Sequence, residues 1–139
     1  MTAKEYLDQA YSIDKQINAK IEQVISLKEL TLKASSALSD MPKGSRNVHS
    51  KENIITKMMD LENEINADID RLVTLKKEIL MIIKSIDRAE YQTLLEMRYL
   101  CFKSWEKIAV EMGYSIQHIF RIHKKALTLI KIKDESKCD

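Results

Sequence analysis

Glycine, proline, cysteine and aromatic residues are all scarce in this chain. Its 139 residues include two glycines, one proline and two cysteines, and aromatic residues make up 6% of the total. Sheets need turns rich in glycine and proline, and loops that hold phosphates need clustered glycines, whereas Gly44 and Gly113 lie far apart. Apolar residues recur every three or four positions over almost the whole length. The sequence therefore predicts an all-α protein.

The same scarcities argue against catalysis. Nucleophilic catalysis needs an activated serine or cysteine, and this sequence has no serine flanked by glycines and no cysteine with a histidine nearby. Paired acids such as Asp68 and Asp70 fall between apolar positions, so we expect them on outward, solvated helix faces. We predict a protein that is not an enzyme and that needs no cofactor.

The cysteines and the hydropathy pattern predict a protein of the reducing cytoplasm. Cys101 and Cys138 form no C-x-x-C motif, which argues against a disulfide scaffold or a zinc knuckle. We expect Cys101 to be a small buried residue and Cys138 to be an exposed thiol. The first residues lack a signal-like apolar run, and the most apolar stretch, residues 79–83, is followed by Lys84, so we expect no membrane partner.

Residues 1–86 have the pattern of a long antiparallel helical hairpin, a coiled-coil-like arm. One amphipathic helix is expected from residue 2 to about residue 38, and a second follows Ser50, which is a candidate N-terminal cap. Residues 39–50 contain the only proline and one glycine, so they predict a loop. The apolar stripes allow the two helices to pair within one chain or between two chains. Their members are Tyr6, Ala10, Ile13, Ile17, Ile21, Val24 and Leu27, then Ile54, Met58, Leu61, Ile65, Ile69, Leu72, Leu75, Ile79, Ile82 and Ile86.

Residues 87–133 predict a unit of three helices, the last two forming a helix-turn-helix. Asp87 is a candidate cap for the first of them. Ser104 can cap the second, Gly113 can end it in left-handed backbone, and Ser115 can cap the third. We expect Trp105 in the core against the third helix. Residues 134–139 are expected to be a disordered tail. The buried face of the third helix is predicted to be Ile119, Ile122, Ala126 and Ile130.

The positive charge of the chain is concentrated in this unit. The formal net charge is +2, but residues 98–139 hold nine Lys and Arg against five Asp and Glu, whereas residues 1–97 hold 14 against 16. From residue 116 to residue 133 there is no acid. A basic patch confined to one module is the electrostatic footprint expected of a partner of double-stranded DNA.

The candidate DNA-binding residues lie on the third helix of this unit. A helix of this kind fits the major groove, where Gln117, His118 and Arg121 have the chemistry to read base edges. His118 and His123 are five residues apart and so lie on different helix faces, which argues against a metal site. The residues expected to contact phosphate are Ser115, Lys124, Lys125 and Lys131.

Residues 104–127 resemble region four of bacterial sigma factors, and with the helical arm the chain is similar to small sigma-region-four-like proteins of phages and prophages in Gram-positive bacteria, related to late-gene transcription activators. Ile116, Gln117 and His118 stand where sigma factors usually carry charged residues, so the standard promoter specificity is not implied. The resemblance implies a location in the cytoplasm of a bacterial host and RNA polymerase as a partner. The matching positions are Ser104, Glu106, Ile108, Gly113, Ser115, Ile119, Ile122, Lys125, Ala126 and Leu127.

Three functions remain open at this stage. The first is a sequence-specific DNA-binding transcription regulator, encoded by a phage, whose arm holds RNA polymerase or another host protein, or forms a homodimer. The second is an oligomerising helical interaction protein, such as a packaging component similar to small terminase subunits. The third is an inhibitor that occupies a host protein through the arm. Basic residues of the loop, Lys43, Arg46 and His49, are further candidates for contact with the DNA backbone.

Overall fold

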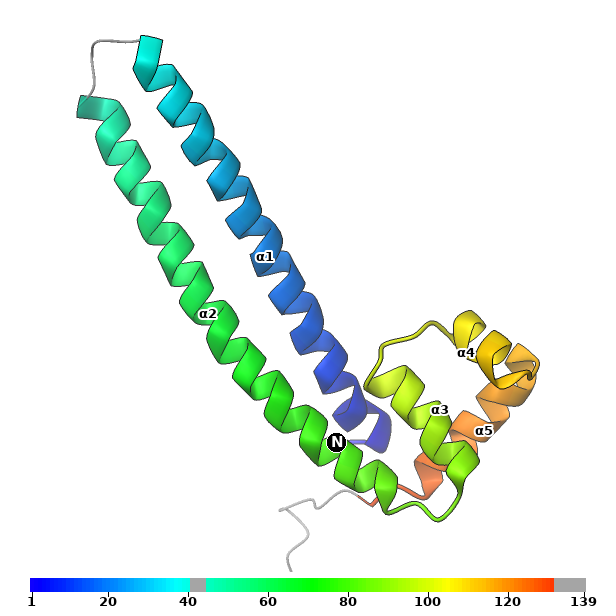
Figure 1. Ribbon diagram of the computed structural model, residues 1–139. Coiled ribbons are helices and arrows are strands. Elements are labelled where there is room, and N and C mark those ends of the chain that lie inside the picture. The colour runs from blue at the N-terminus through cyan, green and yellow to red at the C-terminus, as the bar shows by residue number, and fades with distance from the viewer. Residues whose placement is uncertain (41–44, 132–139) are drawn as a thin grey trace, which may run out of the picture. The chain divides into compact units, whose positions relative to one another are not determined.

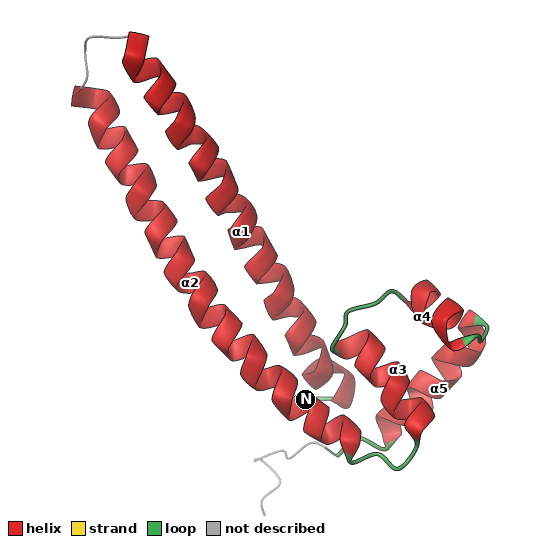
Figure 2. Cartoon of the chain, in the orientation of Figure 1, coloured by secondary structure: helices red, strands yellow, loops and turns green. Residues whose placement is uncertain are grey.

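The protein is built from helices. The computed structural model describes residues 1–40 and 45–131, with side chains described for residues 1–33 and 51–131. The described chain contains no strand and five helices, which confirms the all-α prediction (Figures 1 and 2). None of the helices in this described part combines the length and apolar character needed to cross a membrane. The helices are α1 (Ala3–Asp40), α2 (Ser45–Lys84), α3 (Ala89–Tyr99), α4 (Trp105–Met112) and α5 (Ile116–Thr128).

The chain divides into two compact units. Unit 1 combines Met1–Ile13 with Leu72–Asp139, and unit 2 is Asp14–Arg71. The first turns of α1 belong to unit 1 because their side chains pack there. Leu7 is fully buried, and the Tyr6 hydroxyl donates a hydrogen bond to the Glu78 carboxylate at 3.0 Å. The first turns of α1 thus share one core with the described residues that follow residue 71.

In unit 2, α1 and α2 run side by side in opposite directions (Figure 1). Their contact is mainly apolar, with Ile17, Val24 and Ile65 buried. In the middle of this contact, Lys20 Nζ lies 2.6 Å from Asp68 Oδ2. Asp68 is 6% exposed, so the prediction that it lies on a solvated face is wrong. It is buried because two cations neutralise it, Lys20 and, at 3.5 Å, Arg71.

The two long helices exceed their predicted bounds. Helix α1 continues to Asp40 and α2 begins at Ser45, so a loop over residues 39–50 is too long and Ser50 is not where α2 starts. Residues 45–50 contain neither glycine nor proline, and extending an existing helix is far less costly than starting one. Residues 41–44, including Lys43, and the side chains of Arg46 and His49 lie outside the described residues.

In unit 1, α3, α4 and α5 pack against one another around a closed core, in which Leu94, Leu95, Ile108 and Ile119 are fully buried. The predicted cap of α3, Asp87, is wrong by one residue. Arg88 occupies the N-cap position, and its side chain makes no capping bond. Its guanidinium instead lies 4.8 Å from the centre of the Tyr91 ring and donates to the Tyr91 hydroxyl at 3.2 Å.

The bend between α3 and α4 turns Phe102 rather than Cys101 toward neighbouring side chains. Phe102 has a φ of 57°, in the left-handed region. Its ring lies 5.5 Å from the Tyr11 ring and 4.7 Å from Lys76 Nζ. Cys101 is exposed, so the prediction that it is buried is wrong. Of these two residues, Phe102 has the larger apolar side chain and gains more from these contacts. Cys138 and the tail at residues 134–139 lie outside the described residues.

Candidate nucleic-acid interface

Helices α4 and α5 are joined by a turn whose residues act as the sequence predicts. Ser104 caps α4, with its hydroxyl accepting from the Lys107 backbone N–H at 3.3 Å. Gly113 ends α4 with a φ of 73°, a conformation that residues with a side chain adopt at a cost. Ser115 caps α5, accepting from the His118 backbone N–H at 3.2 Å. The start of α5 is therefore held by local bonds.

One face of α5 is anchored in the core of unit 1. Ile119, Ile122 and Ala126 of α5 are buried, and so is Ile130 just beyond its end, as predicted from their spacing. This face contacts both α3 and α4. Because the apolar side is fixed against two helices, the rotation of α5 about its axis is fixed as well. The opposite side chains are thereby held outward.

Trp105, in the first turn of α4, packs against α5 as expected, although it remains partly exposed. Its ring centre lies 4.6 Å from that of His123 and 5.4 Å from that of Phe120, both in edge-on contacts. The Arg98 guanidinium lies over the same ring, 4.4 Å from its centre. The indole thus clamps α5 and holds one cation of α3 in the scaffold.

His123 is buried in this scaffold and contributes no positive charge to α5. One of its ring nitrogens shares a hydrogen bond with the Tyr99 hydroxyl at 2.5 Å. Burial, together with smaller contributions from the charges of Lys4 and Arg98, lowers the pKa of His123 to about 4. Burial also raises the pKa of Tyr99 above its ordinary value, with a contribution from Asp8. Both groups are neutral near pH 7.

The outward face of α5 is polar and cationic. Gln117, Arg121 and Lys124 are spaced by four and three residues, which places them on one stripe, and all three are exposed. Lys125 is exposed beside this stripe. Helix α5 contains no acid, and none of its three cations forms an ion pair with a described residue. These charges are free to meet a polyanion.

The remaining candidates lie away from this stripe. His118 is partly buried, with its ring edge-on to Tyr114 at 4.5 Å between ring centres. A hydrogen bond to Glu90 raises the pKa of Tyr114. Ser115 is exposed beside the start of α5, and its hydroxyl already accepts the capping bond. Lys131 is exposed but lies beyond Thr128, the last residue of α5. The cationic helix therefore ends before the acid-free sequence, residues 116–133, does.

A family model matches this chain over residues 31–131. Its description is "Protein of unknown function (DUF1492)". The chain belongs to the DUF1492 family. No curated protein and no solved structure matches it. The matched residues span α2, α3, α4 and α5, and so contain the whole outward face of α5.

One residue of the outward face in this DUF1492 protein was missed by sequence reasoning. Phe120 is 45% exposed, next to the stripe formed by Gln117, Arg121 and Lys124. One edge of its ring rests on Trp105. An exposed aromatic side chain beside hydrogen-bonding groups can contact the methyl group of thymine. The sequence did contain a signal for this residue, because Phe120 is a large apolar residue that does not fit the three- and four-residue spacing of the buried face.

The two histidines of α5 in the DUF1492 protein lie in different surroundings. His123 is enclosed by Tyr99 and Trp105, whereas His118 lies beside Tyr114 near the surface. Among the described residues, no three His, Cys, Asp or Glu side chains are grouped so that they could hold a metal ion. The chemistry that this face offers is hydrogen bonding, positive charge and one aromatic surface.

Proposed function

We propose that this protein is a sequence-specific regulator of transcription that binds double-stranded DNA through a helix-turn-helix formed by α4 and α5. The observation that carries the proposal is the outward face of α5, which is cationic, free of acid and unpaired among the described residues. It is also held rigidly by caps and by Trp105. A rigid helix with such a face fits the width of the major groove.

The positions on α5 suggest a division of roles. Gln117 can bridge the two major-groove atoms of an adenine, and Arg121, one turn later, can bridge those of a guanine. Phe120 is placed to contact a thymine methyl group beside them. Lys124 and Lys125 are assigned to phosphates, which orient the protein and set the salt dependence of binding. His118 and Ser115 are assigned to the edge of the interface, with Lys131 as an outlying phosphate contact.

The wider setting of the proposal rests on the resemblance of residues 104–127 to sigma region four. On this basis we assign the protein to the cytoplasm of a bacterial host and to a phage or prophage genome. The paired helices α1 and α2 then form a hairpin arm, followed by the DNA-binding unit. A single helix-turn-helix makes few base contacts, so specific binding usually needs a second protein contact. RNA polymerase or another host protein, held by the arm, is one source of it.

The decisive test is selection of bound duplexes from a random library near physiological salt. The selected duplex and a scrambled one are then titrated at several salt concentrations. We expect at least about a thousandfold preference for the selected duplex. Uniform, steeply salt-dependent binding would contradict the proposal and leave a non-specific basic anchor. A ring of many subunits in light scattering would instead favour a packaging component.

Matched variants separate the assigned roles. Arg121→Ala should weaken binding to the selected duplex by about 1–3 kcal/mol, with a smaller effect on the scrambled one. Lys124→Ala should weaken both equally and reduce the salt slope by about one. Lys57→Ala removes an exposed lysine from α2 and serves as the control, with no change expected in either duplex. The proposal fails if Gln117→Ala combined with Arg121→Ala leaves binding to the selected duplex unchanged.

A further inference from the structure

The paired helices of unit 2 carry an exposed apolar face. In each helix, a stripe of residues spaced by three and four positions is buried against the other helix. The residues that directly follow these buried residues in the sequence form a second stripe, and this second stripe is exposed. The exposed fractions range from 40% at Ile21 to 69% at Leu32. We call this second set the apolar face. It consists of Ile21, Ile25 and Leu32 on α1 and Ile55, Met59 and Ile69 on α2.

Both stripes of the apolar face lie on the same side of the helix pair. In a right-handed helix, the next residue is rotated by about 100° in a fixed sense about the axis. The buried stripes of α1 and α2 face each other, and the two helices run in opposite directions. The residue that follows a buried position therefore lies on the same side of the helix pair in both helices. The six side chains therefore form one surface across the pair, and large exposed apolar surfaces of this kind mark protein contacts.

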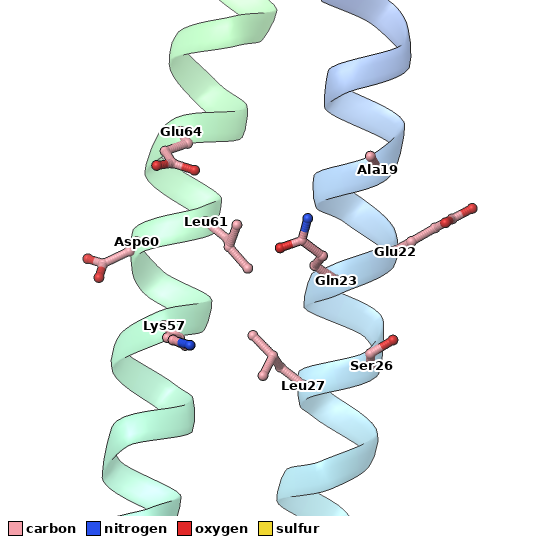
Figure 3. A pocket seen from close by; sticks show the side chains of 9 residues that line it. All are labelled: Ala19, Glu22, Gln23, Ser26, Leu27, Lys57, Asp60, Leu61 and Glu64. Atoms are coloured by element: carbon pink, nitrogen blue, oxygen red, sulfur yellow. The ribbon is translucent and has the colours of Figure 1, made fainter.

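The other side of the same pair carries more polar side chains. This side is formed by the residues that directly precede the buried residues in the sequence. It contains a groove of about 730 Å³ (Figure 3). Gln23 and Ser26 of α1 line it, with Lys57, Asp60 and Glu64 of α2, while Leu27 and Leu61 point toward one another between the helices. Leu30 is the exposed apolar exception on this side. Among the described residues of unit 2, the large exposed apolar side chains therefore gather mainly on one side of the pair.

We infer that a second copy of this chain covers the apolar face. Lys20 lies 2.6 Å from Asp68 and 3.9 Å from Glu64, so Ile25 is level with the turn of Met59, and Leu32 with the turn of Ile55. If the two copies are related by a twofold axis parallel to the helices, α1 of each copy packs on α2 of the other. The residues that are level with each other within one copy then also face each other across the interface. Apolar side chains then meet apolar side chains along the whole contact.

The charges of this surface fit the same arrangement. From residue 18 to residue 32 of α1, the exposed stripe carries one charge, Lys28. From residue 55 to residue 69 of α2, it also carries one, Glu62. Neither forms an ion pair with a described residue. In the twofold arrangement, Lys28 faces α2 of the second copy within about one turn of that copy's Glu62. Opposite charges thus meet twice, once on each side of the axis.

The surface is also large enough for a stable dimer. The described part of unit 2 extends over about 20 residues of each helix, or about 30 Å, and two helices side by side are about 20 Å wide. Its area in projection is therefore about 600 Å², close to the roughly 800 Å² that each partner contributes to a standard interface. The resulting four-helix bundle would be stable without DNA, so this inference does not depend on the proposed DNA binding.

The inference is tested by measuring the mass of the full chain by sedimentation equilibrium in the absence of DNA. We expect a dimer across micromolar concentrations. Ile25→Glu with Met59→Glu should raise the dissociation constant by at least about a hundredfold, because each substitution acts twice in a twofold interface. Gln23→Glu, on the polar side of the same turn, is the matched control and should leave the dimer intact. A wild-type monomer, or equal loss in the control, would overturn the inference.

A charge exchange gives a second measurement that is insensitive to loss of folding. Lys28→Glu and Glu62→Lys should each weaken the dimer by several-fold, because each brings like charges together. The double variant restores opposite charges and should return the dissociation constant toward that of the wild type. Additive weakening in the double variant would overturn the proposed arrangement. Helicity by circular dichroism should be unchanged in all of these variants.

Discussion

Units 1 and 2 hold their helices together in different ways. In unit 1, α3, α4 and α5 enclose side chains completely, with Leu94 and Ile108 at zero exposure. In unit 2, two helices cannot enclose a core from all sides, and the most buried residues, such as Ile17 and Val24, keep 6–8% of their surface exposed. Unit 1 can therefore position its side chains without a partner, whereas unit 2 leaves an apolar surface exposed to which a partner can bind.

The two units also fix the orientation of their surface residues differently. The face of α5 is oriented by caps at its start, by Trp105 and by burial of its opposite side. The level at which α1 meets α2 is marked instead by one buried ion pair, Lys20 with Asp68. Buried polar groups between paired helices can specify register at a cost in stability. This contrast yields four predictions, from the largest expected effect to the smallest.

Truncating a core leucine should cost far more in unit 1 than in unit 2. Leu95 is fully buried, and Leu95→Ala should reduce the free energy of unfolding by about 3–4 kcal/mol through lost burial and a cavity. Leu61 is only partly buried between α1 and α2, so Leu61→Ala should cost about 1–2 kcal/mol. Urea titrations followed by circular dichroism measure both. Equal losses would contradict the contrast between an enclosed and an open core.

Acid should destabilise unit 1 through His123. Its pKa is about 4 in the folded protein and about 6.5 when unfolded, so the unfolded state binds more protons between these values. The stability that its burial confers is present above pH 6.5 and is lost as the pH falls toward 4, by about 1–3 kcal/mol after allowance for partial solvent access.

The control for this pH dependence is His123→Gln, which keeps a polar side chain beside Tyr99 but does not titrate. Thermal unfolding of both proteins between pH 7 and pH 4 makes the comparison. The wild type should lose stability over this range more steeply than the variant. Parallel curves would show that another group is responsible.

Substitution at Gly113 should destabilise the turn between α4 and α5 through the backbone alone. A Cβ added at this position meets no atom within 4 Å, so no packing is disturbed. The φ of 73° nevertheless disfavours a side chain, and Gly113→Ala should cost about 1–2 kcal/mol. Gly113→Asn should cost less, because asparagine adopts left-handed backbone more readily. Chemical denaturation ranks the two, and an equal loss in both would contradict this explanation.

Replacing the buried ion pair of unit 2 should change stability least. Asp68→Ala removes the closest partner of Lys20 and should cost about 1–2 kcal/mol, since Lys20 can still reach water. The double variant Lys20→Leu, Asp68→Leu replaces the pair by apolar contact and should lie within about 1 kcal/mol of the wild type. Denaturation measures both. A double variant less stable than the wild type by clearly more than about 1 kcal/mol would show that the pair itself contributes net stability.

Local signals were read correctly from the sequence where one residue decides the geometry. Ser104, Gly113 and Ser115 act as the caps and the turn that their residue types predict. The cap of α3 was misplaced at Asp87, because Arg88 is held at that position by its contact with Tyr91 rather than by a capping bond. Such a contact depends on packing that no local pattern contains.

The bounds and the burial of the long helices were harder to predict. Ile69 has the spacing of a buried residue but is 40% exposed, while its neighbour Asp68 is buried. Near-continuous apolar and polar spacing allows several rotations of α2 against α1, and the contact of Lys20 on α1 with Asp68 favours the rotation that buries this acid. Cys101 and Phe102 show the same limit, since it is Phe102 whose ring packs against Tyr11 and Lys76 while Cys101 is exposed.

The sequence by itself determined the helical class, the caps of α4 and α5 and the buried side of α5, because these depend on residues close together in the chain. Only the tertiary structure decided that the first turns of α1 join unit 1, that Asp68 lies inside unit 2, and that His123 is neutral beneath Trp105. These outcomes depend on side chains that lie far apart in sequence, and the free energy of burying a charge is set by the partner that folding brings to it.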